Sequence, residues 1–296
     1  DVSREASLIA HEIISGTTEQ SAPAPRRTMV SRPLVMGAAG MGLFAAVILM
    51  LARYLHAFPP TQYPGLKYLF VPLALLAMPA VLILKQPNLG TTLIILAVSG
   101  WILFASGVRL RYFIIVIVLG LAAAPIAWQF LHDYQKQRVM TFLDPSQDPL
   151  GSGYNITQSM IAIGSGGING KGFLKGSQAQ LDFLPEKQTD FIFTMLTEET
   201  GFIGGLVTLG LFTLLIWFAL GVALRSRNMF GSVVAHGVAA MLFFHMFVNT
   251  AMVMGMLPVV GLPLPLLSYG GSMQLAIMLG FGLLMNAWVN RDEKVK

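Results

Sequence analysis

The chain contains no cysteine, so the sequence excludes disulfide bonds and thiol chemistry. Charge is also scarce: 11% of the 296 residues are charged and 55% are hydrophobic, whereas a soluble domain carries about a quarter charged residues. The basic residues form no stripe interleaved with aromatic side chains, which argues against a nucleic-acid-binding protein. They stand in short groups at the ends of apolar runs, a pattern typical of membrane proteins. The composition therefore predicts a polytopic membrane protein.

Acidic residues are missing from most of the chain. Between Glu19 and Asp292 every one of them lies in a single window, residues 133 to 199. The apolar runs on either side carry no ionisable carboxylate and no lysine or arginine near their middle, which counts against an ion-coupled transporter, because such carriers place ionisable groups near the bilayer midplane. Acid–base chemistry is therefore expected only within this window. The window contains Asp133, Asp144, Asp148, Asp182, Glu186, Asp190, Glu198 and Glu199.

Runs of about 20 apolar residues predict spanning helices. We expect seven, over residues 33–53, 67–84, 89–106, 112–130, 201–224, 230–254 and 269–290. Three short basic segments, at residues 109–111, 225–227 and 291–296, place their ends of the bundle in the cytoplasm. The fold class predicted is an all-α, polytopic transmembrane helix bundle with one large extracytoplasmic loop. Its parts are a polar tail (1–32, disordered or non-native), helices (33–130), a catalytic loop (131–200), helices (201–290) and a cytoplasmic tail (291–296).

The predicted outer loop holds a glycine-rich stretch, residues 164–176, that includes Lys171 and Lys175. Glycines let backbone amides approach a ligand and the two lysines add cations, so the stretch could cradle a pyrophosphate. It is not a Walker P-loop, because Gly172 follows Lys171 where a serine or threonine is required. Tight packing and re-entrant turns are the other common use of such glycines, and the spacing leaves both interpretations open.

Asp190 stands at the start of an apolar run, residues 191–200, which we expect to be helical and to end at Gly201. A carboxylate in the first turn of a helix is favoured by the unpaired amides and the dipole, which keep it ionised. One interpretation is therefore a helix-capping aspartate. The other is a general base at the membrane surface, which takes a proton from a sugar hydroxyl. Glu198 and Glu199 are interpreted as structural charges, and His236 and His245 as donors of interhelical hydrogen bonds.

Several segments resemble the SEDS family (shape, elongation, division and sporulation) of bacterial membrane proteins, in order along residues 50 to 290. Its elongation branch, the RodA proteins, is similar in residues 171–178 and 261–265. The resemblance implies ten spans, of which the sequence predicts the last seven, and the family's glutamate and lysine motif is not matched where Met41 and Phe44 stand. The matching segments are residues 85–91, 153–159, 162–167, 170–172, 183–193, 198–201 and 258–272.

The resemblance implies a peptidoglycan glycosyltransferase that polymerises lipid II during cell elongation and rod-shape maintenance. A sugar hydroxyl of one lipid-linked disaccharide attacks the anomeric carbon of another, and undecaprenyl pyrophosphate leaves. The essential outer-loop aspartate of the family falls on Asp190. The expected substrate contacts are Arg138, Gln158, Ser159, Lys171, Lys175, Glu186, Lys187 and Ser268.

The resemblance also implies a location and partners. The location is the bacterial cytoplasmic (inner) membrane, with the large loop facing the periplasm or the cell exterior, and the partners are lipid II, membrane lipid and a class B penicillin-binding transpeptidase, but no nucleic acid. No metal-ligand cluster is evident and no cofactor is expected, although a divalent cation on the pyrophosphate is compatible with the chemistry. Two alternatives stay open: a lipid II flippase or carrier, and an inactive truncated partner of the penicillin-binding protein.

Overall fold

The structure is a computed structural model. It describes residues 32–60, 62, 66–84, 89–130, 133–144, 148, 151–180, 184 and 186–293. Two compact units divide the chain, Asp1–Met36 and Gly37–Lys296. The predicted polar tail falls almost wholly outside the described residues.

All the regular secondary structure that the structure describes in the second unit is α-helical, as predicted. Its seven apolar helices coincide with the seven predicted spans, although residues 192–200, the end of the predicted loop, extend one of them, which begins at Ile192. Three of the described helices, α9 to α11, are long and apolar enough to cross a bilayer, and four shorter apolar stretches lie in α2 to α5. The seven are α2 (Arg32–Ala57), α3 (Leu66–Leu84), α4 (Leu89–Ala105), α5 (Leu110–Phe130), α9 (Ile192–Arg225), α10 (Met229–Val253) and α11 (Gly271–Val289).

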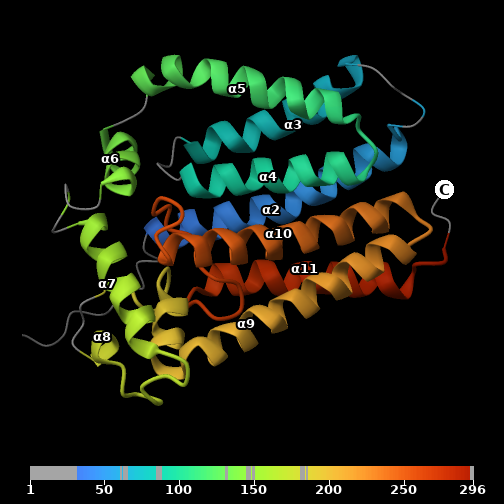
Figure 1. The fold of residues 1–296 in the computed structure, drawn as a ribbon. Coiled ribbons are helices and arrows are strands. Elements are labelled where there is room, and N and C mark those ends of the chain that lie inside the picture. Colours follow the sequence, from blue (N-terminus) through green and yellow to red (C-terminus); the bar gives the residue numbers. More distant parts are fainter. Residues whose placement is uncertain are drawn as a thin grey trace, which may run out of the picture. The chain divides into compact units, whose positions relative to one another are not determined.

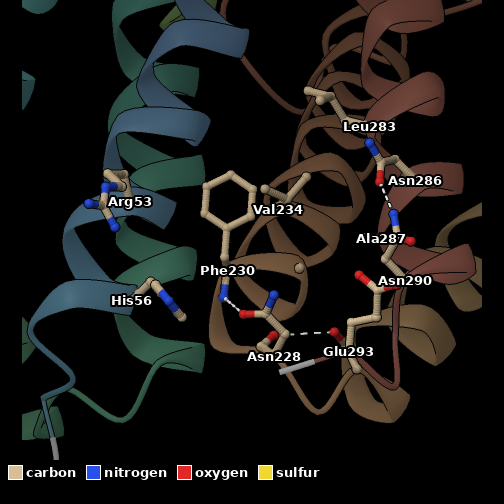
Figure 2. A pocket seen from close by; sticks show the side chains of 12 residues that line it. Arg53, His56, Asn228, Phe230, Val234, Leu283, Asn286, Ala287, Asn290 and Glu293 are labelled. Atoms are coloured by element: carbon tan, nitrogen blue, oxygen red, sulfur yellow. Dashed lines mark hydrogen bonds between the residues drawn. The ribbon is translucent and has the colours of Figure 1, made fainter. Parts of the chain in front are cut away.

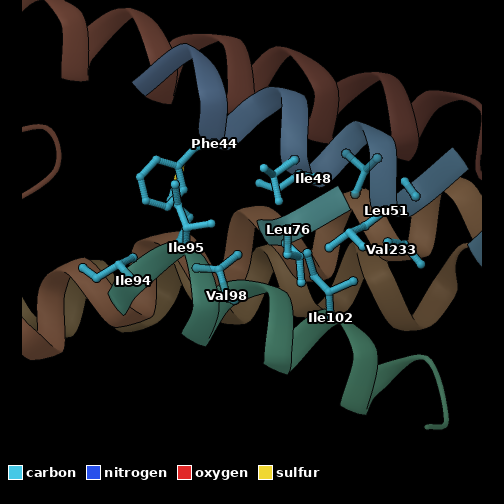
Figure 3. Close-up of a cluster of buried hydrophobic side chains, with 14 of the residues drawn as sticks. Phe44, Ile48, Leu51, Leu76, Ile94, Ile95, Val98, Ile102 and Val233 are labelled. Atoms are coloured by element: carbon cyan, nitrogen blue, oxygen red, sulfur yellow. The ribbon is translucent and has the colours of Figure 1, made fainter. Parts of the chain in front are cut away.

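Helix α10 is the centre of the bundle and packs against α4, α9 and α11. About 61% of its apolar window is buried, against 22% for α9 and for α11. Small residues allow close approach: a side chain on Gly237 would meet Ile48 of α2 at 2.7 Å. Figure 3 shows the result, in which Phe44 and Ile48 of α2 face Ile95 and Ile102 of α4. The buried core therefore joins α2, α4 and α10.

The two ends of the bundle differ in chemistry (Figure 1). One end carries three short helices, α6 (Asp133–Leu143), α7 (Ser152–Gly166) and α8 (Ser177–Gln180), together with the segment that connects α10 to α11. The predicted outer loop is therefore largely helical. The other end carries the basic connections, and the amide of Arg227 donates to the carbonyl of Arg291 at 2.9 Å. The basic segments thus share one end of the bundle, as the predicted orientation requires.

Candidate active site

Helix α9 breaks at Gly201, which has φ 70° and ψ −166°, where the sequence predicts a helical run to end. A break of this kind removes two helical hydrogen bonds and leaves two carbonyls and two amides without partners. The loop of residues 167–172 supplies partners for all four groups. These two carbonyls and two amides are therefore hydrogen-bonded at the edge of the apolar region, where an unpaired group would be costly. The bonds run from Phe202 N to Gly167 O (2.8 Å), Ile203 N to Ile168 O (3.2 Å), Lys171 N to Glu198 O (3.0 Å) and Gly172 N to Glu199 O (2.9 Å).

The glycines of this loop permit the close packing. A Cβ atom on Gly166 would collide with the carbonyl oxygen of Thr197, and one on Gly170 with that of Glu199. Gly170 also has φ 79°, in the left-handed region that favours glycine. Since the amides of Lys171 and Gly172 bond to the kinked helix, they are not available to a phosphate. The structure therefore supports the packing interpretation of the glycine-rich stretch.

Lys171 and Glu198 form an ion pair beneath the same loop. The Lys171 Nζ to Glu198 Oε1 distance is 2.7 Å, and the Glu198 side chain is fully buried. The same oxygen accepts hydrogen bonds from Ser177 Oγ at 3.1 Å and from the amide of Gln178 at 3.2 Å. The structural role predicted for Glu198 is confirmed. The substrate roles predicted for Lys171 and Lys175 stay predictions; the Lys171 ammonium neutralises a buried carboxylate, whereas Lys175 is exposed.

Replacing Lys171 with glutamine is expected to destabilise the protein by about 2 kcal/mol. Removing one member of a buried ion pair costs roughly 3–5 kcal/mol, and the partial exposure of the Lys171 side chain, 28%, reduces that penalty. Thermal unfolding in detergent measures the effect. The matched control is Lys175→Gln, for which we expect no change; equal unfolding temperatures for the two variants would show that the ion pair is not structural.

Asp190 ends a tight turn, residues 186–190, in front of α9. The amides of Thr189 and Phe191 each donate to the carbonyl of Glu186 at 3.2 Å, and Thr189 Oγ1 donates to Glu186 Oε2 at 3.0 Å. The N-cap residue of α9 is Phe191, with no side-chain cap hydrogen bond. The helix-capping interpretation of Asp190 is therefore wrong: the turn, and not the helix end, fixes this residue.

Three consecutive carbonyls of this turn accept hydrogen bonds from residues on α10 and on the segment between α10 and α11. Asn249 on α10 also donates to Leu262 O at 2.7 Å, so its amide joins the turn to that segment. Gly261, with φ 70°, brings the backbone so close that a Cβ atom there would lie 3.4 Å from Asp190 Oδ2. The turn is thus fixed on one side by the far end of the chain. The three bonds are Tyr269 N to Gln188 O (2.8 Å), Ser268 Oγ to Thr189 O (2.6 Å) and Asn249 Nδ2 to Asp190 O (2.8 Å).

The surroundings of Asp190 favour its protonated form. Burial raises the pKa of Asp190 to about 6, the negative charge of Glu186 adds to the increase, and the positive charge of Arg138 on α6 opposes it. The prediction that a helix terminus keeps this carboxylate ionised is therefore wrong in direction, because loss of water outweighs the other contributions. Arg138 and Glu186 thus both act electrostatically on Asp190. A carboxyl group that titrates near neutral pH can both accept and release a proton.

The other predicted site residues divide into two groups. Gln158 on α7 and Lys187 in the turn are half-buried. Ser159 is fully buried; it donates to Val253 O at 2.8 Å and shares a hydrogen bond of 2.7 Å with Thr194 Oγ1, so it joins α7 to α9 and α10. Ser268 is also buried, with its hydroxyl bonded to the turn. Both serines donate to backbone carbonyls inside the fold, and their role as substrate contacts stays a prediction.

A cavity of about 520 Å³ opens beside the turn, in the size range of small-molecule sites. Gln188 and Ile192, on either side of Asp190 in the sequence, line it together with Gln274 and residues 267–271. The Tyr269 side chain is 78% exposed at this cavity. Sequence reasoning missed Tyr269 and Asn249; the signal for Asn249 is an amide within an apolar run, which must find partners when buried. No group of metal ligands occurs among the residues described.

The fold and the site define a multi-pass membrane protein with a tuned carboxylate at one end of its bundle. A family model described as cell cycle protein, of the FtsW, RodA and SpoVE type, matches residues 44–293. The chain therefore belongs to the FtsW/RodA/SpoVE family.

Two curated relatives show how much of the family's length is present. The peptidoglycan glycosyltransferase MrdB of Escherichia coli (strain K12) is 51% identical over 248 residues, which are 83% of this chain and 66% of the relative. Stage V sporulation protein E of Bacillus subtilis (strain 168) is 37% identical over 242 residues, 81% of this chain and 65% of the relative. The chain thus spans just under two thirds of the length of these relatives.

Two solved structures have the same fold. One is a peptidoglycan synthase complex that coordinates polymerization and crosslinking, with a TM-score of 0.71 and 32% identity over 86% of this chain and 70% of that one. The other is the rod shape determining protein RodA of Thermus thermophilus, with a TM-score of 0.58 and 26% identity over 86% of this chain and 66% of that one. Both support a helical membrane bundle.

Proposed function

We propose that the chain acts as a peptidoglycan glycosyltransferase that polymerises lipid II into glycan strands, with Asp190 as the general base. The observation that carries the proposal is the Asp190 carboxyl group, whose pKa is raised to about 6 in a turn fixed by three hydrogen bonds from distant residues. A base with a pKa near neutral is suited to remove a proton from a hydroxyl group at physiological pH. Relatives named peptidoglycan glycosyltransferases support the choice of reaction.

In the proposed reaction, Asp190 takes the proton of an acceptor sugar hydroxyl as that oxygen attacks the anomeric carbon of the donor. The bond from this carbon to the pyrophosphate oxygen breaks, and undecaprenyl pyrophosphate leaves with the bonding electrons. Arg138, whose charge already acts on Asp190, and Lys187 in the same turn would stabilise the negative charge of the leaving group. The cavity beside Gln188 and Tyr269 is the proposed place for a sugar headgroup.

The proposed location follows from the two ends of the bundle. The basic connections would face the cytoplasm under the positive-inside rule, so Asp190 would face the periplasm or the cell exterior at the surface of the inner membrane. A carboxylate there meets the sugar headgroup while the apolar helices contact the polyprenyl chain. The partner we propose is a class B penicillin-binding transpeptidase, supported by the similarity to a peptidoglycan synthase complex.

The test is polymerisation by the purified chain of fluorescently labelled lipid II in detergent or liposomes. We expect a ladder of glycan products on gels, and its disappearance after digestion with a muramidase. A chain that moves labelled lipid II across vesicles without making any polymer would instead be a flippase. Co-purification with the transpeptidase but no polymer, with or without that partner, would point to a non-catalytic role.

A further inference from the structure

A second cavity lies at the basic end of the bundle, opposite to the end that carries Asp190. Its volume is about 340 Å³, and it opens between the end of α2, the start of α10 and the end of α11 (Figure 2). Arg53 and His56 line it from α2, three residues apart and so on one face of that helix. The proposed glycosyl transfer does not use either residue.

The cavity has two polar walls of opposite character. Arg53 is exposed on the α2 side, and the Nδ1 atom of His56 is buried with no hydrogen-bond partner within the described residues. On the other side stand Asn290 and the exposed carboxylate of Glu293 (Figure 2). Where the structure describes the chain, Arg53 and Glu293 form no ion pair. A cationic wall therefore faces an anionic one, with the charges left for a ligand.

The interior of the cavity is apolar. Phe230 and Val234 of α10 and Leu283 of α11 line it, so a bound molecule would contact hydrocarbon at one end and charge at the other. The cavity also lies at the end of apolar helices, at the level where lipid headgroups meet a bundle, and polar pockets between spanning helices bind such headgroups. A purely anionic headgroup would meet the Glu293 carboxylate, and a purely cationic one would meet Arg53.

We propose that this cavity binds a zwitterionic aminophospholipid. The phosphate would accept hydrogen bonds from Arg53 and from His56, and the primary ammonium would donate to Glu293 and to the side-chain carbonyl oxygen of Asn290. The glycerol and the first part of an acyl chain would cover Phe230 and Leu283. The site is independent of Asp190 and would exist whether or not the chain is a glycosyltransferase.

The test is lipid retention by the purified chain, measured by native mass spectrometry after exchange into detergent with defined lipids. We expect retention of phosphatidylethanolamine at least tenfold above phosphatidylglycerol, and weaker retention of phosphatidylcholine, whose trimethylated nitrogen has no N–H to donate. Glu293→Gln should remove the preference, because Glu293 binds the ammonium, whereas Arg53→Gln should lower the retention of both phosphatidylethanolamine and phosphatidylglycerol, because both carry the phosphate, and Arg53→Lys should restore it in part. The matched control is Arg109→Gln, an exposed arginine at the same end outside the cavity.

Two results would overturn the proposal. One is equal retention of phosphatidylethanolamine and phosphatidylglycerol by the unmodified chain, which would indicate annular lipid only. The other is the same loss in Arg109→Gln as in Arg53→Gln, which would indicate a general surface charge effect. Circular dichroism and the unfolding temperature of each variant verify that the helices are intact, and Arg53→Lys keeps the test valid if Arg53→Gln fails to fold.

Discussion

Replacing Asp190 with asparagine is expected to lower the polymerisation rate by on the order of 10³-fold while the protein stays folded. General-base catalysis by a positioned group contributes roughly 10²–10⁴-fold, and asparagine has the same shape but cannot accept the proton. The Asn249 side-chain amide donates to the backbone carbonyl of residue 190 and not to its side chain, so the turn should persist. The initial rate of glycan formation from labelled lipid II is the measurement, and Asp133→Asn, at an exposed residue at the start of α6, is the control that should retain full activity.

The unfolding temperature of the same variant distinguishes a catalytic role of Asp190 from a structural one. Because the pKa of Asp190 in the folded protein, about 6, exceeds its ordinary value of 3.8, the folded state binds this proton more tightly than the unfolded state. The resulting stabilisation is complete below pH 3.8 and is lost as the pH rises through 6. At pH 7.5 the charged carboxylate is therefore unfavourable in its site, and Asp190→Asn should unfold at the same or a higher temperature. A clear fall in the unfolding temperature would contradict this account.

The pH dependence of the rate follows from the same pKa. Since the ionised carboxylate is the active form, the rate of the unmodified chain should rise about tenfold per pH unit below pH 6 and level off above it. The residual rate of Asp190→Asn should lack this step. A rate that stays constant between pH 5 and pH 7 in the unmodified chain would exclude Asp190 as the group that titrates.

The helices could be predicted from the sequence because their signal is local. An apolar run of bilayer length has few alternatives to a helix, and Gly201 marks the break in α9 because its backbone has φ 70°. The acidic window was accessible to sequence reasoning too, since the predicted spans contain no aspartate or glutamate, and the resemblance to the SEDS family singled out Asp190 within that window. What the sequence could not supply is how these local elements share their hydrogen bonds.

Hydrogen-bond partners were predicted poorly because a polar side chain in an apolar run has both near and distant options. We expected His236 and His245 to bond between helices, but their Nδ1 atoms lie 2.9 Å from the carbonyl oxygens of Ser232 and Met241, one turn back on the same helix. The Lys171 ion pair was missed for the opposite reason: its partner, Glu198, lies 27 residues along the chain and is brought close by the kink. Neither outcome is encoded in spacing.

The second large effect is expected for Asn249→Ala, which should destabilise the protein by about 3 kcal/mol and slow polymerisation by about 10²-fold. The Asn249 side chain is fully buried and donates to both Asp190 O and Leu262 O. Its removal leaves two carbonyls without donors, at roughly 1–3 kcal/mol each. The turn then loses the bond nearest the carboxylate, and a displacement of about 1 Å in a reacting group can reduce the rate by two orders of magnitude.

Thermal unfolding and the polymerisation rate per folded molecule, measured well below both unfolding temperatures, distinguish the two consequences. Asn155→Ala, at a half-buried asparagine on α7, is the control and should have little effect on the rate. If Asn249 only stabilised the bundle, the folded fraction of Asn249→Ala would polymerise at the full rate. A reduced rate with an unchanged apparent affinity for lipid II would instead show that the Asn249 side-chain amide on α10 positions the Asp190 carboxylate.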